Sequence, residues 1–315
     1  MTAKVFIDGE VGTTGLQIRA RLERRADLTL IRLDDAQRKD PKARAEALNA
    51  ADVAILCLPD EAAKESVSLV TNPKTKVIDA STAHRVADGW VYGFPELESG
   101  HREKIKASTR IANTGCYAVA SVSLLHPLVK AGLIPADYPV TINAVSGYSG
   151  GGKSLIQAFE DPKAENHIEA AVRLYALGLA HKHVPEIQKY GGLTHAPLFV
   201  PTVARYAQGM IVQIPLQLWS LPKKITGKDL QAALAAHYQG CRFVGVADYD
   251  AALKTAHLEP EDLNDTNHLK LYVFANEGRE QAVLTAQLDN LGKGAAGQAV
   301  QLLNILLGLP EETGL

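Results

Sequence analysis

The chain has 315 residues, 46% of them hydrophobic and 22% charged, which is the composition of a globular protein with one large domain or two ordinary ones. Its 33 Lys and Arg against 35 Asp and Glu give a net charge of −2, a balance that argues against nucleic-acid binding. Three cysteines, an odd number and too few for a disulfide framework, fit a reducing compartment. The opening residues lack the apolar core of a signal peptide, and no run approaches the roughly 18 apolar residues of a membrane span. We therefore expect a cytoplasmic protein with no membrane partner.

The first third of the chain alternates strand patterns with helix patterns. Strand-like runs occupy 4–8, 28–33, 52–59, 76–81 and 110–113, and helical spacing occupies 16–26, 43–51 and 61–72. Strands that alternate with helices predict an α/β fold, a Rossmann-like doubly wound parallel sheet covered on both faces.

The pattern changes after residue 116. Strand-like runs at 139–147, 198–205, 210–219, 269–277 and 281–289 lie closer together and alternate more regularly. They predict a second, α+β domain with a mixed or antiparallel sheet. The final run, 294–309, is apolar enough for a largely buried helix.

A glycine loop connects the first strand to the first helix. Gly9, Gly12 and Gly15 follow a G-x-x-G-x-x-G spacing, and Thr13 and Thr14 add hydroxyl donors. Glycines permit a tight turn and a close approach to a pyrophosphate, while the following helix N-terminus offers N–H groups. The alternative is a plain strand-to-helix turn, but the position at the first such turn favours dinucleotide binding.

The identity of the dinucleotide is left open by the residues after the second strand. Asp34 or Asp35 lies about 20 residues beyond the loop, where an acid holds the ribose of NAD. Arg38 follows at once, and an arginine there accepts the 2′-phosphate of NADP.

One cysteine has the surroundings of a nucleophile. Cys116 follows the turn signal Asn113-Thr114-Gly115 and precedes an apolar helical run, so its sulfur is expected at a helix N-terminus, which favours the thiolate. Cys57 and Cys241 are expected to be inert core residues.

A thiolate nucleophile needs an acid/base partner, and His181, His183 and Glu186 lie within six residues of one another. Two histidines at i and i+2 on an extended segment point to one side. Metal binding is the competing interpretation of the pair, but no further ligand has the required spacing, so we expect no metal site. A thiolate beside a nicotinamide indicates an aldehyde or acyl-phosphate dehydrogenase.

The stretch GYSGGGKS at 147–154 matches the P-loop pattern of NTPases, with Lys153 at the phosphate-binding position. Its place in the less regular half of the chain weakens that interpretation, and Asp289 is the only plausible acid for Mg²⁺. Such a loop, Gly150 included, can also cradle the phosphate of a substrate or a cofactor.

Seven motifs together carry a family resemblance. They are GEVGTTG (9–15), DASTAHR (79–85), GFPEL (93–97), NTGCY (113–117), SGYSGGGK (146–153), HKHVPEI (181–187) and LDNLGKGAAGQAVQLLN (288–304). On these the chain resembles the N-acetyl-γ-glutamyl-phosphate reductases of arginine biosynthesis, in particular their shorter type. Aspartate-semialdehyde dehydrogenases, which share the architecture, share only some of the motifs.

The resemblance implies an NADP(H)-binding domain over 1–115, completed by the C-terminal helix at 291–315, and a catalytic and dimerisation domain over 116–290. It implies a homodimer or homotetramer and a small acyl-phosphate substrate. The chain departs from the family pattern at Thr114, where a proline is usual.

The resemblance also implies site residues and a mechanism. Cys116 attacks the acyl phosphate, phosphate leaves, and the thioester is reduced by hydride from NADPH, with a histidine handling protons. We favour His183 over His181 for that role. The remaining residues form two sets. Cofactor contacts are expected from Gly9, Gly12, Thr13, Thr14, Gly15, Arg38, Ser81, Gly150 and Asn290, and substrate contacts from Arg85, Asn113, Glu186 and Lys153.

Three alternatives remain: an aspartate-semialdehyde dehydrogenase type of enzyme, a P-loop NTPase, and a non-catalytic NADP-binding sensor. The sensor would bind cofactor regardless of Cys116, and the NTPase would depend on Lys153.

Overall fold

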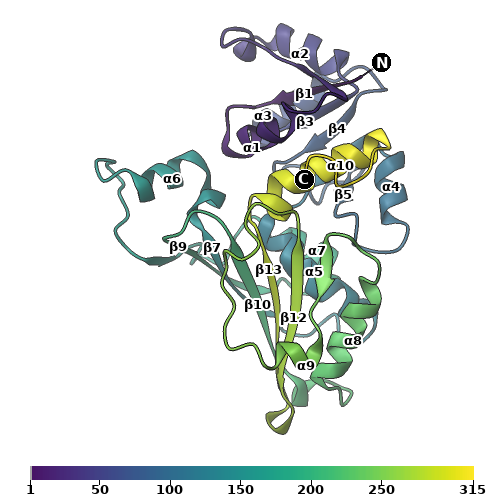
Figure 1. The fold of residues 1–315 in the computed structure, drawn as a ribbon, viewed down its shortest axis with the longest axis vertical. Helices are drawn as coiled ribbons and strands as arrows, with labels where there is room; N and C mark the ends of the chain where they lie inside the picture. The colour runs from purple at the N-terminus through teal and green to yellow at the C-terminus, as the bar shows by residue number, and fades with distance from the viewer. Residues whose placement is uncertain (1) are drawn as a thin grey trace. The chain divides into compact units, whose positions relative to one another are not determined.

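The computed structural model describes residues 2–315, which fall into two units (Figure 1). Unit 1 holds residues 2–95, Ser99–Gly115 and Ala295–Leu315, and unit 2 holds Glu96–Glu98 and Cys116–Gly294. The short segment 96–98 and residues 291–294, which the sequence analysis grouped with the cofactor domain, thus belong to unit 2.

Unit 1 is built on a six-stranded parallel sheet of order β2-β1-β3-β4-β6-β5. Its elements, with bounds, are β1 (Ala3–Asp8), α1 (Thr13–Leu22), β2 (Leu28–Ile31), η1 (Gln37–Lys39), α2 (Pro41–Ala50), β3 (Val53–Leu56), α3 (Asp60–Ser68), β4 (Lys76–Asp79), β5 (Val91–Gly93), α4 (His101–Ala107), β6 (Arg110–Asn113) and α10 (Gly297–Leu307). This confirms the predicted doubly wound fold.

Alternation along the strands supplies a core on each face of this sheet. Val5 and Ile7 of β1 pack in one cluster with residues of α1 and α10, whereas Phe6 packs in the other with Ala47 and Leu48 of α2. The C-terminal helix α10 therefore completes unit 1, and Figure 1 shows it beside β4, β5 and α4. The predicted buried helix at the C-terminus is confirmed.

Unit 2 contains a seven-stranded mixed sheet of order β11-β12-β13-β10-β7-β9-β8. Its elements are α5 (Cys116–Lys130), β7 (Thr141–Gly147), η2 (Tyr148–Gly151), α6 (Gly152–Glu160), β8 (Val172–Leu174), α7 (Val184–Gly191), β9 (Leu198–Ala204), β10 (Met210–Gln217), η3 (Leu218–Ser220), α8 (Gly227–His237), β11 (Val244–Val246), α9 (Tyr249–Ala252), β12 (Leu269–Asn276), η4 (Glu277–Arg279) and β13 (Gln281–Leu288). A π-helical turn, η5 (Gly292–Ala296), begins in this unit.

Helix α5 is the central helix of unit 2. It packs against β10 and β13 and contacts α7 and α8. Residues on the opposite side of the strands stay partly or fully exposed, among them Val145, Val200, Pro215 and Val283. One face of the sheet is thus buried under helices, while the other keeps apolar side chains at the surface.

Candidate active site and cofactor pocket

Cys116 is the first residue of the 15-residue helix α5, so the predicted position at a helix N-terminus is confirmed. Its side chain is partly exposed, whereas the residues on both sides of it, Gly115 and Tyr117, are buried. The unpaired N–H groups and the dipole of a helix N-terminus stabilise a thiolate. An accessible, electrostatically favoured sulfur is what a nucleophile requires.

The other two cysteines differ from Cys116. Burial raises the pKa of Cys57 to about 12, so that thiol stays protonated near neutral pH. Cys241 lies partly buried in the loop after α8. Neither cysteine begins a helix.

The two predicted histidines lie together beside the start of α5. The ring centroids of His181 and His183 are 4.7 Å apart, with the planes at 77°. The predicted extended segment is wrong, because residues 181–183 form a turn and His183 has the helical angles φ −84° and ψ −12° as the N-cap of α7. The turn, rather than strand alternation, brings the rings to one side.

A backbone hydrogen bond selects one tautomer of His181. The His183 N–H donates to His181 Nδ1 at 3.1 Å, so a neutral His181 carries its proton on Nε2. His181 is partly exposed, whereas His183 is 6% exposed. His181 is therefore built to present a proton donor at Nε2.

Aromatic side chains enclose the two histidines. The ring of Tyr117, next to the cysteine, lies 5.8 Å from each histidine ring, and Phe199 lies 5.1 Å from His181. Tyr175 lies 5.7 Å from His181 and donates a 3.0 Å hydrogen bond from its hydroxyl to that of Tyr117.

Both phenols of this enclosure stay neutral. Burial raises the pKa of Tyr117 well above its ordinary value and the pKa of Tyr175 to about 12. The sequence analysis missed Tyr175 and Phe199, because nothing in their local spacing marks them.

Glu186 occupies the first turn of α7 and is 1% exposed. Pro185 stands at the start of this helix, as predicted. Burial, with Glu186 as a secondary cause, raises the pKa of Tyr190 to about 12. The carboxylate of Glu186 thus faces the interior of unit 2.

Gly150 and Asn290 are brought together in unit 2, but the Asn290 amide is already bonded within the protein. Its Nδ2 donates to Ser149 Oγ at 2.9 Å, and its Oδ1 accepts from the Gly209 N–H at 2.7 Å. A Cβ at Gly150 would lie 3.4 Å from Asn290 Nδ2. Asn290 therefore fastens the segment after β7 to the residue preceding β10.

The stretch resembling a P-loop does not have the geometry of one. The N–H groups of Gly147, Tyr148 and Ser149 donate to backbone carbonyls at 2.9, 2.9 and 3.0 Å, so they are not directed at an anion. Lys153 is exposed on α6. Asp289 is buried and accepts hydrogen bonds from the Leu291 N–H and the Gln208 side chain. The NTPase interpretation loses its structural support.

In unit 1, the glycine loop has the predicted context of strand, turn and helix. Gly9 has φ +87°, and a Cβ there would lie 2.4 Å from the carbonyl oxygen of Cys57. A Cβ at Gly15 would lie 2.4 Å from the carbonyl oxygen of Gly9, whereas one at Gly12 would make only ordinary contacts of 3.5 Å or more. Helix α1 begins at Thr13 with no side-chain cap. Its N-terminus, with Thr14 in the first turn, fits an anionic ligand.

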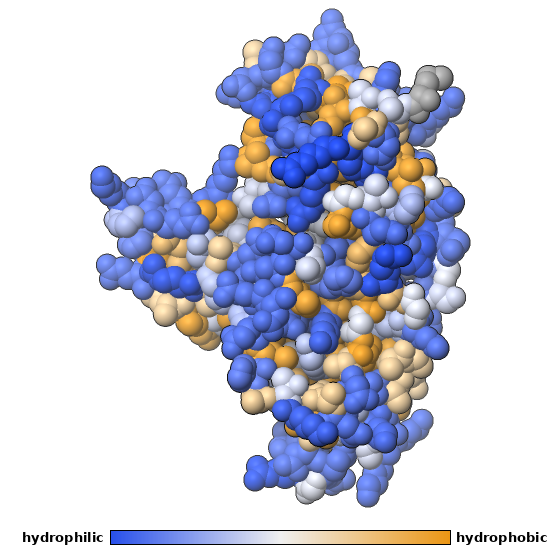
Figure 2. All heavy atoms as spheres, viewed as in Figure 1, coloured by the Kyte–Doolittle hydropathy of each residue, from blue (hydrophilic) through white to orange (hydrophobic). Residues whose placement is uncertain are grey.

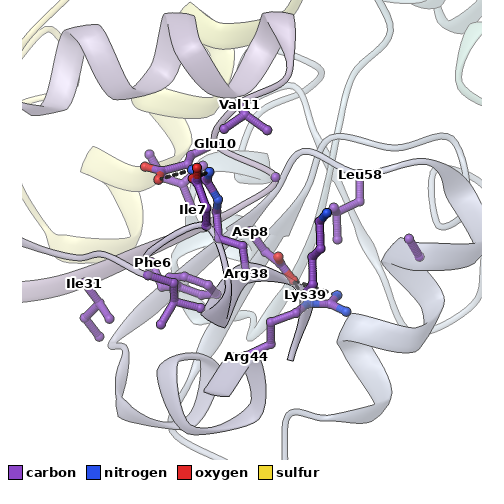
Figure 3. Close-up of a pocket in the computed structure, with 14 residues that line it drawn as sticks. Phe6, Ile7, Asp8, Glu10, Val11, Ile31, Arg38, Lys39, Arg44 and Leu58 are labelled. Carbon is purple, nitrogen blue, oxygen red and sulfur yellow. Dashed lines mark hydrogen bonds and ion pairs between the residues drawn. The ribbon is translucent and has the colours of Figure 1, made fainter. Parts of the chain in front are cut away.

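A pocket of about 460 Å³ opens beside this loop (Figure 3). Arg38 lines it and forms ion pairs with Glu10, at 3.3 Å, and with Asp35. Figure 3 shows the Lys39 side chain extending over the pocket toward Leu58. Its lining combines apolar side chains with the cations Arg38, Lys39 and Arg44 and the carboxylates Asp8, Glu10 and Asp35.

The acidic residues near the pocket have separate roles. Asp34 Oδ1 accepts hydrogen bonds from the N–H groups of Ala36 and Gln37, so it holds the turn that leads into η1. Asp8 is buried and pairs with Arg44 at 3.0 Å.

The DASTAHR motif and the end of β6 form a hydrogen-bonded cluster in unit 1. The buried Asp79 accepts from Ser81 Oγ at 2.7 Å and lies 2.6 Å from His84 Nδ1. Arg85 donates to the carbonyl of Asn113 at 3.0 Å and to that of Ala80 at 3.1 Å. The guanidinium thus connects the ends of β4 and β6.

Asn113 donates its side-chain amide to the carbonyl of Ala295 at 2.9 Å. Its Oδ1 is buried with no hydrogen-bond partner among residues 2–315. A buried oxygen without a partner is costly, and a ligand that donates to it would remove that cost.

Within residues 2–315, no group of three or more His, Cys, Asp or Glu side chains is arranged to hold a metal ion. The same part of the chain contains no helix with the length and hydropathy needed to cross a bilayer.

Comparisons with known proteins agree with this geometry. Residues 116–290 match the family model described as semialdehyde dehydrogenase, dimerisation domain, and residues 15–108 match the one described as semialdehyde dehydrogenase, NAD binding domain. The chain is 53% identical over 313 residues to N-acetyl-gamma-glutamyl-phosphate reductase 2 of Pseudomonas putida, covering 99% of each. It is 55% identical over 309 residues to the N-acetyl-gamma-glutamyl-phosphate reductase of Chelativorans sp., covering 98% of this chain and 99% of the relative.

Solved structures show the same fold at low identity. Aspartate semialdehyde dehydrogenase II of Vibrio cholerae matches with a TM-score of 0.70 and 17% identity, over 98% of this chain and 99% of that one. Aspartate semialdehyde dehydrogenase with NADP from Candida albicans matches with a TM-score of 0.67 and 14% identity, over 98% and 99%.

Proposed function

Because the chain belongs to the N-acetyl-γ-glutamyl-phosphate reductase family, we propose that it reduces N-acetyl-γ-glutamyl phosphate to the γ-semialdehyde and phosphate, a step of arginine biosynthesis. The observation that carries the proposal is Cys116 at the first position of α5, with the rings of His181 and His183 each 5.8 Å from that of Tyr117, the next residue. We assign unit 1 to the cofactor, unit 2 to the chemistry and self-association, and the cytoplasm as the compartment.

Cys116 performs the first chemical step. Its thiolate attacks the acyl carbon, the bond from that carbon to the phosphate oxygen breaks, and phosphate leaves with the bonding electrons. The product is a thioester on Cys116. The N–H groups at the start of α5 lie where negative charge develops on the carbonyl oxygen, so they are the natural oxyanion donors.

A histidine stabilises the oxyanion that hydride transfer creates. The fixed tautomer and partial exposure of His181 support it as a hydrogen-bond donor from Nε2–H to that oxyanion, which then collapses to the aldehyde as the carbon–sulfur bond breaks and the thiolate leaves. His183 is buried against Tyr117, so we assign it a supporting part. The two variants His181→Gln and His183→Gln separate these roles, since a lost proton donor lowers kcat more than it raises KM.

NADPH, when bound, supplies the hydride. Gly9, Gly12 and Gly15 with the N–H groups of Thr13 and Thr14 would hold its pyrophosphate, and Arg38 would hold its 2′-phosphate. The hydrogen bonds that Asp34 Oδ1 accepts in the turn before η1 support this choice, because they engage that oxygen within the protein. Ser81 lies at the carboxyl end of β4, the edge at which such sheets bind dinucleotides.

Arg38 offers the test of cofactor choice. Removing a charge-assisted hydrogen bond costs about 1.5–3 kcal/mol, so Arg38→Gln should raise the KM for NADPH about 10- to 150-fold and change that for NADH little. Arg32→Gln is the matched control, because Arg32 is an exposed arginine in the segment between β2 and η1 and pairs with Glu23. An unchanged NADPH preference in Arg38→Gln would overturn the assignment.

For the substrate, we keep Asn113, Arg85, Glu186 and Lys153 as proposed contacts. Asn113 and Glu186 are each 1% exposed, Arg85 already donates to two carbonyls, and Lys153 is exposed, so none is favoured over the others.

The decisive assay runs the reaction in reverse. N-acetyl-glutamate γ-semialdehyde, phosphate and NADP⁺ are mixed with wild type, Cys116→Ser and the control Cys241→Ser, and NADPH absorbance is followed. We expect phosphate-dependent NADPH formation that only Cys116→Ser abolishes. Aspartate semialdehyde is the competing substrate, and a preference for it would move the proposal to the aspartate-semialdehyde dehydrogenases.

We also propose that a second copy of the chain binds the partly exposed sheet face of unit 2, giving a homodimer. Leu174, Leu177, Leu179 and Leu198 are each more than 40% exposed, on or near the edge strand β8 and its neighbour β9. Figure 2 shows hydrophobic side chains gathered over the part of this unit that carries β9. Apolar surface of this kind is typical of interfaces.

Light scattering after size-exclusion chromatography tests this interface. Leu198→Asp should yield monomers, and Leu253→Asp, a similarly exposed leucine after α9, should not. A Leu198→Asp dimer would contradict the assignment.

A further inference from the structure

A fully buried ion pair lies in unit 2, outside the catalytic cluster described above. Lys293 Nζ lies 2.9 Å from both carboxylate oxygens of Glu96, and both side chains have no solvent exposure. The ammonium also lies 5.5 Å from the ring centroid of Phe243. Lys293 is one of the largest fully buried side chains among residues 2–315.

Stability alone is a poor reason for such a pair. Burying two charges costs desolvation energy that their attraction only partly restores, so apolar residues of similar size are often at least as stabilising. In some proteins a buried ionic group instead fixes one arrangement of the chain. The question is which segment this pair positions.

The segment is the turn that contains Lys293. The Gly294 N–H donates to the carbonyl of Asp289 at 3.0 Å, and a Cβ at Gly292 would lie 2.0 Å from the carbonyl oxygen of Thr266. This turn begins the π-helical stretch η5. Short π-helical turns of this kind occur frequently at functional sites.

Gly294 is packed directly on the nucleophile. A Cβ at Gly294 would lie 2.8 Å from Cys116 Cβ and 3.4 Å from Cys116 Cα. The 2.8 Å distance is shorter than real Cβ contacts allow. Any displacement of the turn toward α5 therefore moves Cys116. Any displacement of the turn away from α5 opens space beside the Cβ of Cys116.

We propose that Glu96 and Lys293 are a positioning pair that holds the Gly294 backbone against Cys116 and so sets the orientation of its thiol. The inference rests on the proposed role of Cys116 as nucleophile. Glu96 is itself held in place, because the carbonyl of its neighbour Leu97 is hydrogen-bonded to His237 Nε2 at 3.0 Å. The pair thus connects the anchored segment 96–98 to the turn beside the cysteine.

The test replaces the pair with apolar residues of similar size and measures Cys116 directly. In Glu96→Met/Lys293→Met we expect a melting temperature at or above wild type. The rate of Cys116 alkylation by iodoacetamide, read by peptide mapping without substrate, should fall at least tenfold. In the reverse assay kcat should fall at least tenfold with the KM for NADP⁺ unchanged.

The matched control is Glu98→Gln/Lys130→Gln, which removes a more exposed ion pair on the same segment. It should leave both rates within twofold of wild type. A merely structural pair would give the double Met variant wild-type alkylation and kcat, and that result overturns the proposal.

Gly294→Ala keeps the proposal testable if the double Met variant fails to fold. It leaves the ion pair intact and displaces Cys116, so alkylation should again change at least tenfold; an unchanged rate overturns the proposal. Alkylation needs no reductase activity. If Cys116→Ser retained reductase activity, the proposed function would fail while the positioning result could still be read.

Discussion

Replacing Gly12 by alanine tests whether the glycine loop is a cofactor cradle or only a tight turn. Gly12 has φ −75° and ψ 167°, angles that alanine adopts readily, and its added Cβ would meet nothing closer than 3.5 Å. Losing the glycine at the helix N-cap destabilises the fold, whereas alanine makes the unfolded chain less flexible and so stabilises the fold. Each effect is about 0.5–1 kcal/mol, and the two oppose one another. The fold should therefore tolerate Gly12→Ala within about 1 kcal/mol.

Cofactor affinity should respond quite differently. A methyl at Gly12 adds bulk to the loop that, in the proposed function, the pyrophosphate approaches closely. Losing one charge-assisted hydrogen bond costs about 1.5–3 kcal/mol, which raises the Kd for NADPH about 10- to 150-fold. Titration calorimetry at fixed salt measures the Kd, and thermal unfolding measures stability on the same samples.

Two further glycines serve as references. Gly15→Ala places a Cβ 2.4 Å from the carbonyl oxygen of Gly9, an overpacking that costs about 1–3 kcal/mol and should lower the melting temperature by roughly 2–12 °C. Gly245→Ala, on β11, meets nothing within 4 Å and should change neither quantity. If Gly12→Ala bound NADPH as tightly as wild type, the cradle assignment would be refuted.

Three other predictions concern titration and the P-loop-like stretch. At pH 7.5 iodoacetamide should label Cys116 before Cys57. The pKa of about 12 at Cys57 leaves about one molecule in 30,000 with that thiol ionised, and only the thiolate reacts. Early labelling of Cys57 in peptide maps would contradict this. Burial lowers the pKa of both His126 and His237, so the unfolded chain binds protons more readily. Their contribution to stability is thus complete above about pH 6.5 and is lost as the pH falls. Urea midpoints between pH 7 and 5 should fall less steeply in His126→Gln/His237→Gln than in wild type. Lys153→Ala should leave kcat within about twofold, because the side chain is exposed, and Mg²⁺-dependent ATP hydrolysis by wild type would speak against the reductase.

Local patterns predicted the parts of the site that are local in the chain. The loop at 9–15 joins β1 to α1 as its glycine spacing indicates, and Cys116 begins α5 because a turn signal precedes an apolar helical run. Strands such as β6 and β13 were recognised because their alternation or apolar content exceeds that of the surrounding chain. These features depend on backbone sterics and on the period of side chains along a few turns.

Short elements were missed. The three-residue strands β5, β8 and β11 have too few residues to show a period, and each exists because a longer strand pairs with it. The predicted extended geometry at 181–183 failed for a related reason: the helix start at Val184 imposes a turn there.

The amino-acid sequence by itself determined the fold class, the nucleophile at a helix start and the glycine loop, since each is set by neighbouring residues. Only the tertiary structure decided that Tyr175 contacts Tyr117 across 58 residues, that Asn290 bonds Ser149 across 141, and that Lys293 meets Glu96 across 197. Such pairs form because burying the sheets brings distant segments into one dry interior. There each buried polar group must find a partner, and no local period encodes which one.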